Sequence, residues 1–231
     1  MSAEMSAAMS ARVASIPSPA DRESAFALVP VSRETSDRLD RFVDLLLSWQ
    51  KTTNLISPST IPHLWTRHVA DSLQLLDLAP DARVWIDLGS GGGFPGLVIA
   101  CALADQPGAA VHLVESNSRK AAFLREAARV IGVPATIHAV RIENFVDSYE
   151  GGADVVTARA LAPLKVLLDQ GFPLLARGAL GLFLKGQDVV AELTEASKYW
   201  KINHTLVPSR TDSTGRVVIV RALERRPRAP Q

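Results

Sequence analysis

Residues 86–96 read "IDLGSGGGFPG", an apolar run that gives way to five glycines and one proline. A turn between a strand and a helix needs about one or two glycines, because few of its positions adopt a left-handed backbone. This loop contains several more. The excess predicts that a ligand approaches the main chain here so closely that side chains are excluded.

The segments on either side of the loop predict a parallel sheet covered by helices. After Pro80, short β-branched runs alternate with helix-length segments, which is typical of a doubly wound α/β fold. We expect a short turn between the third and fourth strands and a closing antiparallel hairpin at the end, which together give a mixed seven-stranded sheet flanked by helices. The expected strands are "RVWIDLG", "AVHLVES", "ATIHAV", "ADVVTAR", "ALGLFLKG", "INHTLVPS" and "RVVIVRAL", and the expected helices span residues 95–105, 118–131, 163–176 and 187–200.

The pattern before and after this core predicts four parts. Residues 1–30 are rich in Ala, Ser and Pro without a helical or strand period, so we expect a mobile extension without chemistry. Residues 31–80 are expected to form a helical lobe, because two stretches near 35–50 and 63–78 have helical periodicity. The α/β domain is expected over residues 81–222, and a basic tail over 223–231.

Composition narrows the class of protein. The chain has 231 residues, 47% of them apolar and 21% charged, as in soluble globular proteins. Its 25 basic and 24 acidic residues nearly cancel, so bulk charge predicts no nucleic-acid partner. A local basic patch follows residue 209, and a solvated tail explains it as well as a phosphate contact does. Its arginines are Arg210, Arg216, Arg221, Arg225, Arg226 and Arg228.

Other signals predict a cytoplasmic protein without a metal. The single cysteine, Cys101, lies in an apolar run and is expected to be a buried, inert thiol, so no disulfide is possible within the chain. The five histidines have no metal-ligand spacing. The beginning of the chain lacks the apolar core of a signal peptide, and no segment is expected to span a membrane.

The glycine pattern fits two classes of ligand. Gly91, Gly93 and Gly96 match the dinucleotide fingerprint, and Glu115 lies where an acid would hold the ribose of an adenosine cofactor. Asp87 at the strand tip would repel a pyrophosphate and suits a ligand with an ammonium group. Pro95 removes an N–H that a pyrophosphate would use. These features and the terminal hairpin favour an adenosine cofactor other than NAD.

Six segments carry a resemblance to a known family. They are "IDLGSGGGFPGLVIA", "LVESNSRKAAFL", "RIENF", "TARALAPL", "FLKG" and "RHVADSL". Over residues 35–222 the chain resembles the RsmG or GidB family of methyltransferases, which modify a guanine of small-subunit ribosomal RNA. The resemblance implies a Rossmann-like class I methyltransferase fold, S-adenosylmethionine as cofactor, and 16S ribosomal RNA in the small ribosomal subunit as partner. The implied target is ring nitrogen 7 of a guanine in the 530 loop.

The resemblance also implies the residues of the site. Glu115 would take the ribose hydroxyls, and the pair in "RIENF" would line the adenine. The implied cofactor-binding residues are Gly89, Gly91, Phe94, Glu115, Ile142, Glu143 and Arg159, and the weaker candidates for RNA contact are Lys185, Lys165, Arg210 and Arg216.

No catalytic residue is expected. Nitrogen 7 of guanine has a free lone pair and no proton, so the reaction needs alignment rather than a general base. His68 and Asp71 lie three residues apart on an expected helix, and we interpret them as structural. Two other classes remain open, a nicotinamide-dependent oxidoreductase and a non-catalytic RNA-binding or ribosome assembly protein.

Overall fold

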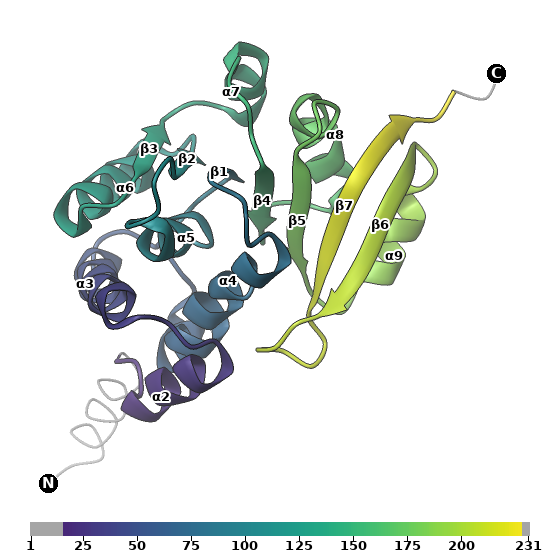
Figure 1. Ribbon diagram of the computed structural model, residues 1–231. Coiled ribbons are helices and arrows are strands. Elements are labelled where there is room, and N and C mark those ends of the chain that lie inside the picture. The colour runs from purple at the N-terminus through teal and green to yellow at the C-terminus, as the bar shows by residue number, and fades with distance from the viewer. Residues whose placement is uncertain (1–15, 228–231) are drawn as a thin grey trace, which may run out of the picture.

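A computed structural model describes residues 16–227. Its strands form one seven-stranded sheet with the order β3-β2-β1-β4-β5-β7-β6 (Figure 1). The first five strands are parallel, and β7 runs antiparallel to both of its neighbours, β5 and β6. This confirms the predicted mixed sheet. The strands are β1 (Val84–Leu88), β2 (Ala110–Val114), β3 (Ala135–His138), β4 (Val155–Arg159), β5 (Leu180–Lys185), β6 (Trp200–Pro208) and β7 (Arg216–Arg225).

Helices cover both faces of the sheet and enclose a separate hydrophobic core on each. One face is covered by α3 (Arg33–Gln50), the π-helical segment η2 (Trp65–Ala70), α5 (Gly96–Leu103) and α6 (Ser118–Ile131). The other is covered by α7 (Ile142–Ser148), α8 (Leu164–Leu175) and α9 (Val189–Ala196). Short elements complete the helical part: η1 (Pro58–His63), α4 (Asp71–Leu73) and η3 (Leu76–Leu78).

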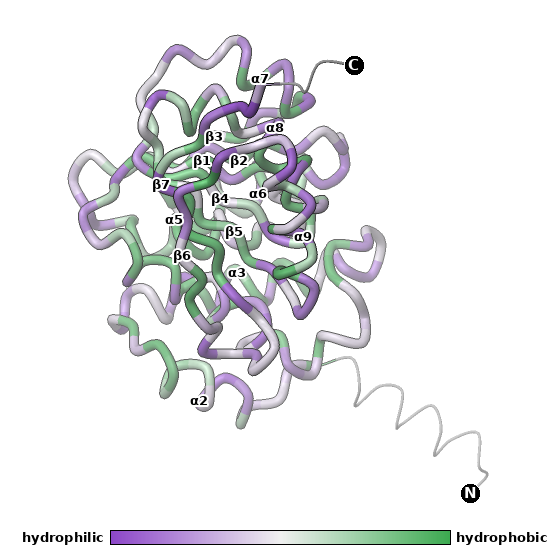
Figure 2. The backbone as a smooth tube through the Cα atoms, turned by 90° about the vertical axis from the view of Figure 1, so that its right-hand side faces the viewer, coloured by the Kyte–Doolittle hydropathy of each residue, from purple (hydrophilic) through white to green (hydrophobic). Residues whose placement is uncertain are grey.

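The strand sequences supply both cores because neighbouring residues of a strand point to opposite faces. In β1, Trp85 belongs to the first core, whereas Ile86 and Leu88 belong to the second. Figure 2 shows the strands as largely hydrophobic in the interior of the molecule. A strand that is buried on both faces reads as a continuous apolar run, which is why the parallel strands were predictable.

The N-terminal boundary differs from the expected one. Helix α2 (Pro19–Leu28) lies within the segment expected to be a mobile extension, and that prediction is wrong for this helix. Its buried Asp21 accepts hydrogen bonds from the backbone amides of Trp65, at 2.8 Å, and Thr66, at 3.3 Å. The carboxylate thereby caps the first amides of η2, because the first amides of a helix have no acceptor within the helix itself. Residues 1–15 lie outside the described part of the chain.

Two further expectations are corrected. Helix α7 replaces the predicted short turn, because Phe145 and Val146 anchor it in the second core. The predicted basic tail begins inside β7, where the guanidinium of Arg225 lies 4.9 Å from the centre of the Trp200 ring. Residues 228–231 are not described. Between residues 16 and 227, no helix is long and apolar enough to cross a membrane.

The strand order places a ligand crevice between β1 and β4. From β1 the chain proceeds to β2 and β3 on one side, and it then returns to build β4 and β5 on the other. In open parallel sheets, ligands bind beyond the carboxyl ends of the strands where the order reverses in this way. The glycine loop follows β1 at this position.

Candidate active site

The glycine loop forms a backbone cradle at the carboxyl end of β1. Gly89 and Gly91 have φ angles of +70° and +53°, a region that L-residues with side chains rarely adopt. The amides of Gly89 and Ser90 donate to the carbonyl oxygen of Val114, at 2.9 and 3.1 Å, which fixes the loop against β2. The loop therefore presents bare main chain to the crevice.

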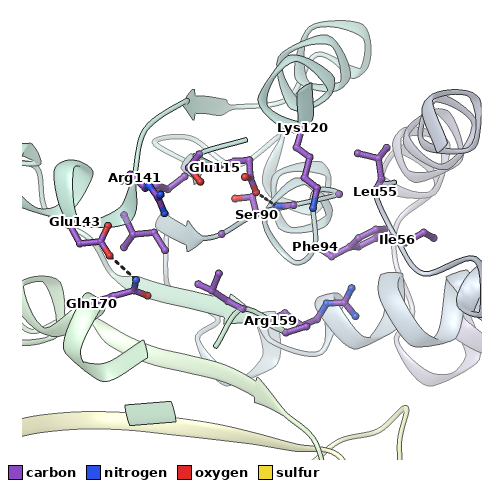
Figure 3. Close-up of a pocket in the computed structure, with 18 residues that line it drawn as sticks. Leu55, Ile56, Ser90, Phe94, Glu115, Lys120, Arg141, Glu143, Arg159 and Gln170 are labelled. Atoms are coloured by element: carbon purple, nitrogen blue, oxygen red, sulfur yellow. Dashed lines mark hydrogen bonds between the residues drawn. The ribbon is translucent and has the colours of Figure 1, made fainter. Parts of the chain in front are cut away.

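A cavity of about 410 Å³ adjoins this loop (Figure 3). All the residues that the resemblance implies for the cofactor line it, although they come from four separate segments of the chain. The structure thus brings together Gly89, Gly91, Phe94, Glu115, Ile142, Glu143 and Arg159. Their agreement in space supports the prediction that they share one ligand.

Glu115 lies at the end of β2 and faces the loop. Its Oε2 accepts from the amide of Gly91 at 2.9 Å, and its Oε1 accepts from the amide of Asn117 at 2.7 Å. Each carboxylate oxygen can accept a second hydrogen bond. The side chain is held by the protein and retains acceptor capacity toward the cavity, which suits binding of a diol such as a ribose.

Glu115→Ala is expected to weaken binding of the adenosine cofactor by about 1–3 kcal/mol, the range for losing hydrogen bonds to a charged group. Titration calorimetry with S-adenosylmethionine measures this loss. Glu126→Ala is the matched control, because Glu126 is a carboxylate on α6 that pairs with Arg129 and lies outside the cavity. Equal affinity of the Glu115 variant and the control would show that Glu115 only supports the loop.

Asp87 does not have the role that its place at the strand tip suggested. Its side chain is 1% exposed and is absent from the cavity lining. Its carboxylate accepts from the amide of Gly96 at 3.1 Å and from the hydroxyl of Thr157 at 3.2 Å. Burial raises the pKa of Asp87 to about 6. The residue fastens the start of α5 beneath the loop, and the inference that it faces an ammonium group is wrong.

Arg159 projects from the end of β4 and forms one side of the cavity (Figure 3). Its guanidinium lies 5.3 Å from the centre of the Phe94 ring and donates to the carbonyl oxygen of Arg67 at 3.1 Å. Oδ2 of Asp71 lies 3.7 Å from Nη1 of Arg159 and supplies the opposite charge. The cation is therefore held in one place by contacts on several sides.

The histidine of "RHVADSL" has both ring nitrogens occupied. Arg159 donates to Nδ1 of His68, so the proton of the neutral ring is on Nε2, which donates to the hydroxyl of Thr60 at 2.8 Å. The hydroxyl of Thr60 donates in turn to the carbonyl oxygen of Ser57 at 2.7 Å. Burial, with the nearby charge of Arg159, lowers the pKa of His68 to about 3. This geometry supports the interpretation of His68 as structural.

Asp71 joins the helical lobe to the terminal hairpin. Its Oδ1 accepts from the side chains of Thr211, at 2.9 Å, and Gln74, at 2.8 Å. Gln74 also accepts from the amide of Arg210 at 3.0 Å. Burial raises the pKa of Asp71. These bonds hold the turn between β6 and β7 beside the crevice.

A second cavity of about 550 Å³ lies next to the first. The two share Leu55, Ile56, Arg159 and Ala160 as a common wall. The helical lobe, the terminal hairpin, the end of β5 and Glu192 of α9 line the rest of the second cavity. Arg67 and Arg216 bring positive charge to it. The second cavity therefore adjoins the first through this wall.

The four cations predicted to contact RNA lie in different settings. Arg216 lines the second cavity, but Lys165 and Arg210 line neither one. Lys165 pairs with Asp169 at 2.8 Å, and Arg210 with Asp77 at 2.6 Å. These ion pairs are partly exposed and still permit a phosphate contact.

Lys185 differs from these three because it is internal. It also lines the second cavity, but its side chain is 9% exposed, and Nζ lies 2.6 Å from the carboxylate of Glu192. The charge of Lys185 is therefore paired inside the protein, and its predicted contact with RNA stays a prediction.

Several lining residues were not predicted from the sequence. Lys120 and Arg141 bring positive charge to the mouth of the first cavity, and Gln170 donates to Glu143 at 2.9 Å (Figure 3). Lys120 and Arg141 stand inside the quoted motifs, which is a signal that could have identified them. Leu161 also stands inside a quoted motif, "TARALAPL", whereas Gln170 lies within α8 and carries no such signal.

The residues of the first cavity suit an adenosine cofactor. A side chain at Gly89 would meet Leu161 at 2.5 Å, so the cradle depends on bare main chain. Apolar walls from Leu55, Ile56 and Ile142 suit a base, and the Glu115 carboxylate suits a ribose. Over residues 16–227, no group of three or more His, Cys, Asp or Glu residues could hold a metal ion.

Comparisons with known proteins all identify the same family of methyltransferases. The family model described as GidB, rRNA small subunit methyltransferase G, matches residues 35–218. The Ribosomal RNA small subunit methyltransferase G of Bradyrhizobium sp. (strain BTAi1) is 62% identical over 216 residues, which is 94% of this chain and 97% of that protein. The protein of the same name from Nitrobacter hamburgensis is 61% identical, over 92% of this chain and 82% of its own length.

Solved structures share the fold at low sequence identity. The O-methyltransferase TomG from Streptomyces achromogenes, solved in complex with SAM, superposes with a TM-score of 0.57 at 14% identity. The alignment covers 85% of this chain and 94% of that one. A putative O-methyltransferase from Klebsiella pneumoniae gives 0.56 at 13% identity, over 89% and 97%. These similarities confirm the class I methyltransferase fold.

Proposed function

The chain belongs to the rRNA small subunit methyltransferase G (GidB) family, and from this premise we propose that it methylates ring nitrogen 7 of a guanine in 16S ribosomal RNA. The enzyme is an S-adenosylmethionine-dependent methyltransferase of 16S ribosomal RNA, as its family and its relatives' names indicate. The single observation that carries the finer assignment is the pair of adjoining cavities with Arg159 between them.

The first cavity binds the cofactor in this proposal. When bound, S-adenosylmethionine would supply a sulfonium methyl group, which a nucleophile accepts while the neutral thioether S-adenosylhomocysteine leaves with the electron pair of the broken S–C bond. The loop from Gly89 to Gly93 receives the cofactor against the main chain, and Glu115 accepts from the ribose hydroxyls. Arg159 and Phe94 close the side that faces the second cavity and limit access of water.

The second cavity receives the target base. Nitrogen 7 of guanine needs no deprotonation, so residues that position the ring suffice. The hydrogen bonding of His68 supports this view, because the neutral ring donates from one nitrogen and accepts at the other and has none available as a base. Nitrogen 7 lies in the major groove, which is deep and narrow in A-form RNA, so the target is an unpaired or deformable guanine.

A transfer assay tests the proposed function directly. Small ribosomal subunits that lack the modification, and the 16S RNA extracted from them, are incubated with the protein and methyl-labelled S-adenosylmethionine. We expect label in the RNA at one guanine, located by mapping the modified base. Absence of transfer to both substrates would contradict the proposal and would favour a non-catalytic RNA-binding or assembly role.

A thermal shift assay separates the proposal from a nicotinamide-dependent oxidoreductase. A ligand that binds only the folded state raises the melting temperature, by an amount that grows with the logarithm of its concentration relative to its dissociation constant. S-adenosylmethionine is expected to raise it, and NAD at the same concentration is not.

Because the substrate class is ribosomal RNA, we also place the protein in the cytoplasm.

Arg216 is the predicted RNA contact that the geometry favours most. Arg216→Ala is expected to weaken RNA binding and to reduce the slope of log affinity against log salt by about 1, because one phosphate contact is lost. Arg221→Ala is the matched control, since Arg221 lies on the same strand, donates to Thr205 at 2.7 Å and lines neither cavity. Equal slopes for the two variants and the wild type would make Arg216 a bystander.

A further inference from the structure

The segment from Ala160 to Leu164 leads from β4 into α8, and it begins in the wall shared by the two cavities. Ala160 lines both cavities and has a φ angle of +50°, a strained conformation for a residue with a side chain. Leu161 lines the first cavity and packs over Gly89. Such strain persists only where the surrounding structure holds the backbone in place.

One ion pair holds the second half of this segment. Lys185, the last residue of β5, donates from Nζ to the carbonyl oxygen of Ala162 at 2.7 Å. Glu192 of α9 accepts from the amide of Leu164 at 2.5 Å through Oε2. The same carboxylate oxygen lies 2.6 Å from Nζ of Lys185. Two side chains from neighbouring elements therefore fix a carbonyl and an amide two residues apart.

The Glu192 contact replaces a missing helix cap. Helix α8 begins at Leu164 after Pro163, whose side chain has no group that could accept a hydrogen bond. The first amides of a helix need an acceptor, and a carboxylate there also interacts favourably with the helix dipole. Glu192 supplies that acceptor from another helix, so the start of α8 is placed relative to α9 and β5.

Stability alone does not explain the pair. Burying two charges costs much of what their attraction returns, and apolar residues of similar volume are often as stable. A geometric role accounts for the pair better, because each partner also binds the backbone of the same short segment.

We propose that Lys185 and Glu192 are positioning residues that hold Ala160–Leu164 in the conformation required for methyl transfer. Through this segment they fix Ala160 and Leu161 at the wall between the two cavities. This inference rests on the proposed function of those cavities. It replaces the sequence-based prediction that Lys185 contacts an RNA phosphate.

The two roles of Lys185 predict opposite effects of removing Glu192. If Lys185 binds RNA, Glu192 competes with the phosphate, and Glu192→Leu strengthens RNA binding without lowering the rate. If the pair positions the segment, Glu192→Leu and Lys185→Met both lower the single-turnover rate at saturating cofactor and RNA. We expect a fall of about 100-fold, the effect of small misplacements at a reacting centre.

The double variant, Lys185→Met with Glu192→Leu, keeps the test valid if a single variant leaves a buried charge and does not fold. It contains no unpaired charge, so it is expected to be folded and to melt near the wild-type temperature. Its rate is expected to be as low as that of the single variants, and its RNA affinity and salt slope are expected to match those of the wild type. A wild-type rate in the double variant would overturn the proposal, as would weaker RNA binding with a reduced salt slope.

Hydrogen exchange separates this inference from the proposed function. In the free protein, loss of Glu192 removes the acceptor of the Leu164 amide, so this amide is expected to exchange faster in the double variant. Amides in the core of α8 are the internal control and are expected to be unchanged. If the Leu164 amide exchanges faster in the double variant but the wild type transfers no methyl group, the contact between Glu192 and Leu164 is supported and the proposed function is refuted. Unchanged exchange at Leu164 would refute the positioning contact.

Discussion

An RNA substrate whose target guanine is replaced by 7-deazaguanine is expected to bind normally and to receive no methyl group. The replacement exchanges one ring nitrogen for C–H and leaves the Watson–Crick edge and the phosphates in place. The lone pair that attacks the methyl group is then gone. The other nitrogens of the base are not positioned to accept the methyl group in its place. Labelled transfer and filter binding on the same RNA measure the two effects.

The matched control carries 7-deazaguanine at a neighbouring guanine and leaves the target intact. This RNA is expected to be methylated at the normal rate. Transfer to the 7-deaza target would prove that another atom is the acceptor, and the proposed role of the second cavity as a site that only positions the base would then need a residue that removes a proton.

Gly89→Val is expected to abolish detectable cofactor binding while leaving a folded protein. A Cβ at this position would lie 2.5 Å from Cδ1 of Leu161, and the φ angle of +70° disfavours any side chain. Because Leu161 lines the first cavity, its displacement and the added methyl groups both act at the cavity wall. Titration calorimetry with S-adenosylmethionine at wild-type saturating concentrations tests the loss.

Gly108→Val separates the loss of binding from backbone strain. Gly108 has a similar φ angle of +78°, and a Cβ there would meet nothing within 4 Å. Left-handed strain costs roughly 1–2 kcal/mol for a residue with a side chain, so both variants are expected to be less stable than the wild type. Only Gly89→Val should lose the cofactor. Normal binding by both variants would mean that the cofactor does not approach the main chain at Gly89.

The fold was predictable because its parallel strands are buried on both faces. Continuous apolar runs such as that of β1, separated by helices of suitable length, admit few arrangements other than a doubly wound sheet. The first cavity was predictable for a related reason. Its residues stand at the ends of successive parallel strands, which meet at one edge, so their positions in the chain determine their proximity.

The second cavity and its cations were much less predictable. Whether a lysine at a strand end points to solvent depends on its neighbours, and Glu192 meets Lys185 only because α9 packs beside α8. Residue spacing contains no trace of that contact. Asp87 shows the same limit, because the sequence placed it at a strand tip, and only the fold of the loop turns Gly96 back onto its carboxylate.

Helix α2 was missed because it has little apolar periodicity of its own. Ala25 and Val29 are buried, but a distant polar contact fixes the helix, namely the carboxylate of Asp21 on the amides of Trp65 and Thr66. The Ala, Ser and Pro content of this segment, without a helical period, predicted a mobile extension. The contacts of Asp21 with η2 hold the helix in place despite this composition.

The wall shared by the two cavities predicts that the ligands bound in them are thermodynamically coupled. Arg159 and the pair Leu55 and Ile56 face both sides, so a ligand that restricts these side chains in one cavity lowers the entropy that the second ligand must still remove. Linkage makes such an effect mutual, so we expect RNA to tighten the binding of the cofactor by the same factor by which the cofactor tightens the binding of RNA. The hydrogen-bonded chain from Arg159 through His68 to Thr60 connects this wall to the loop of the helical lobe. We therefore expect a ligand in the first cavity to restrict this loop as well.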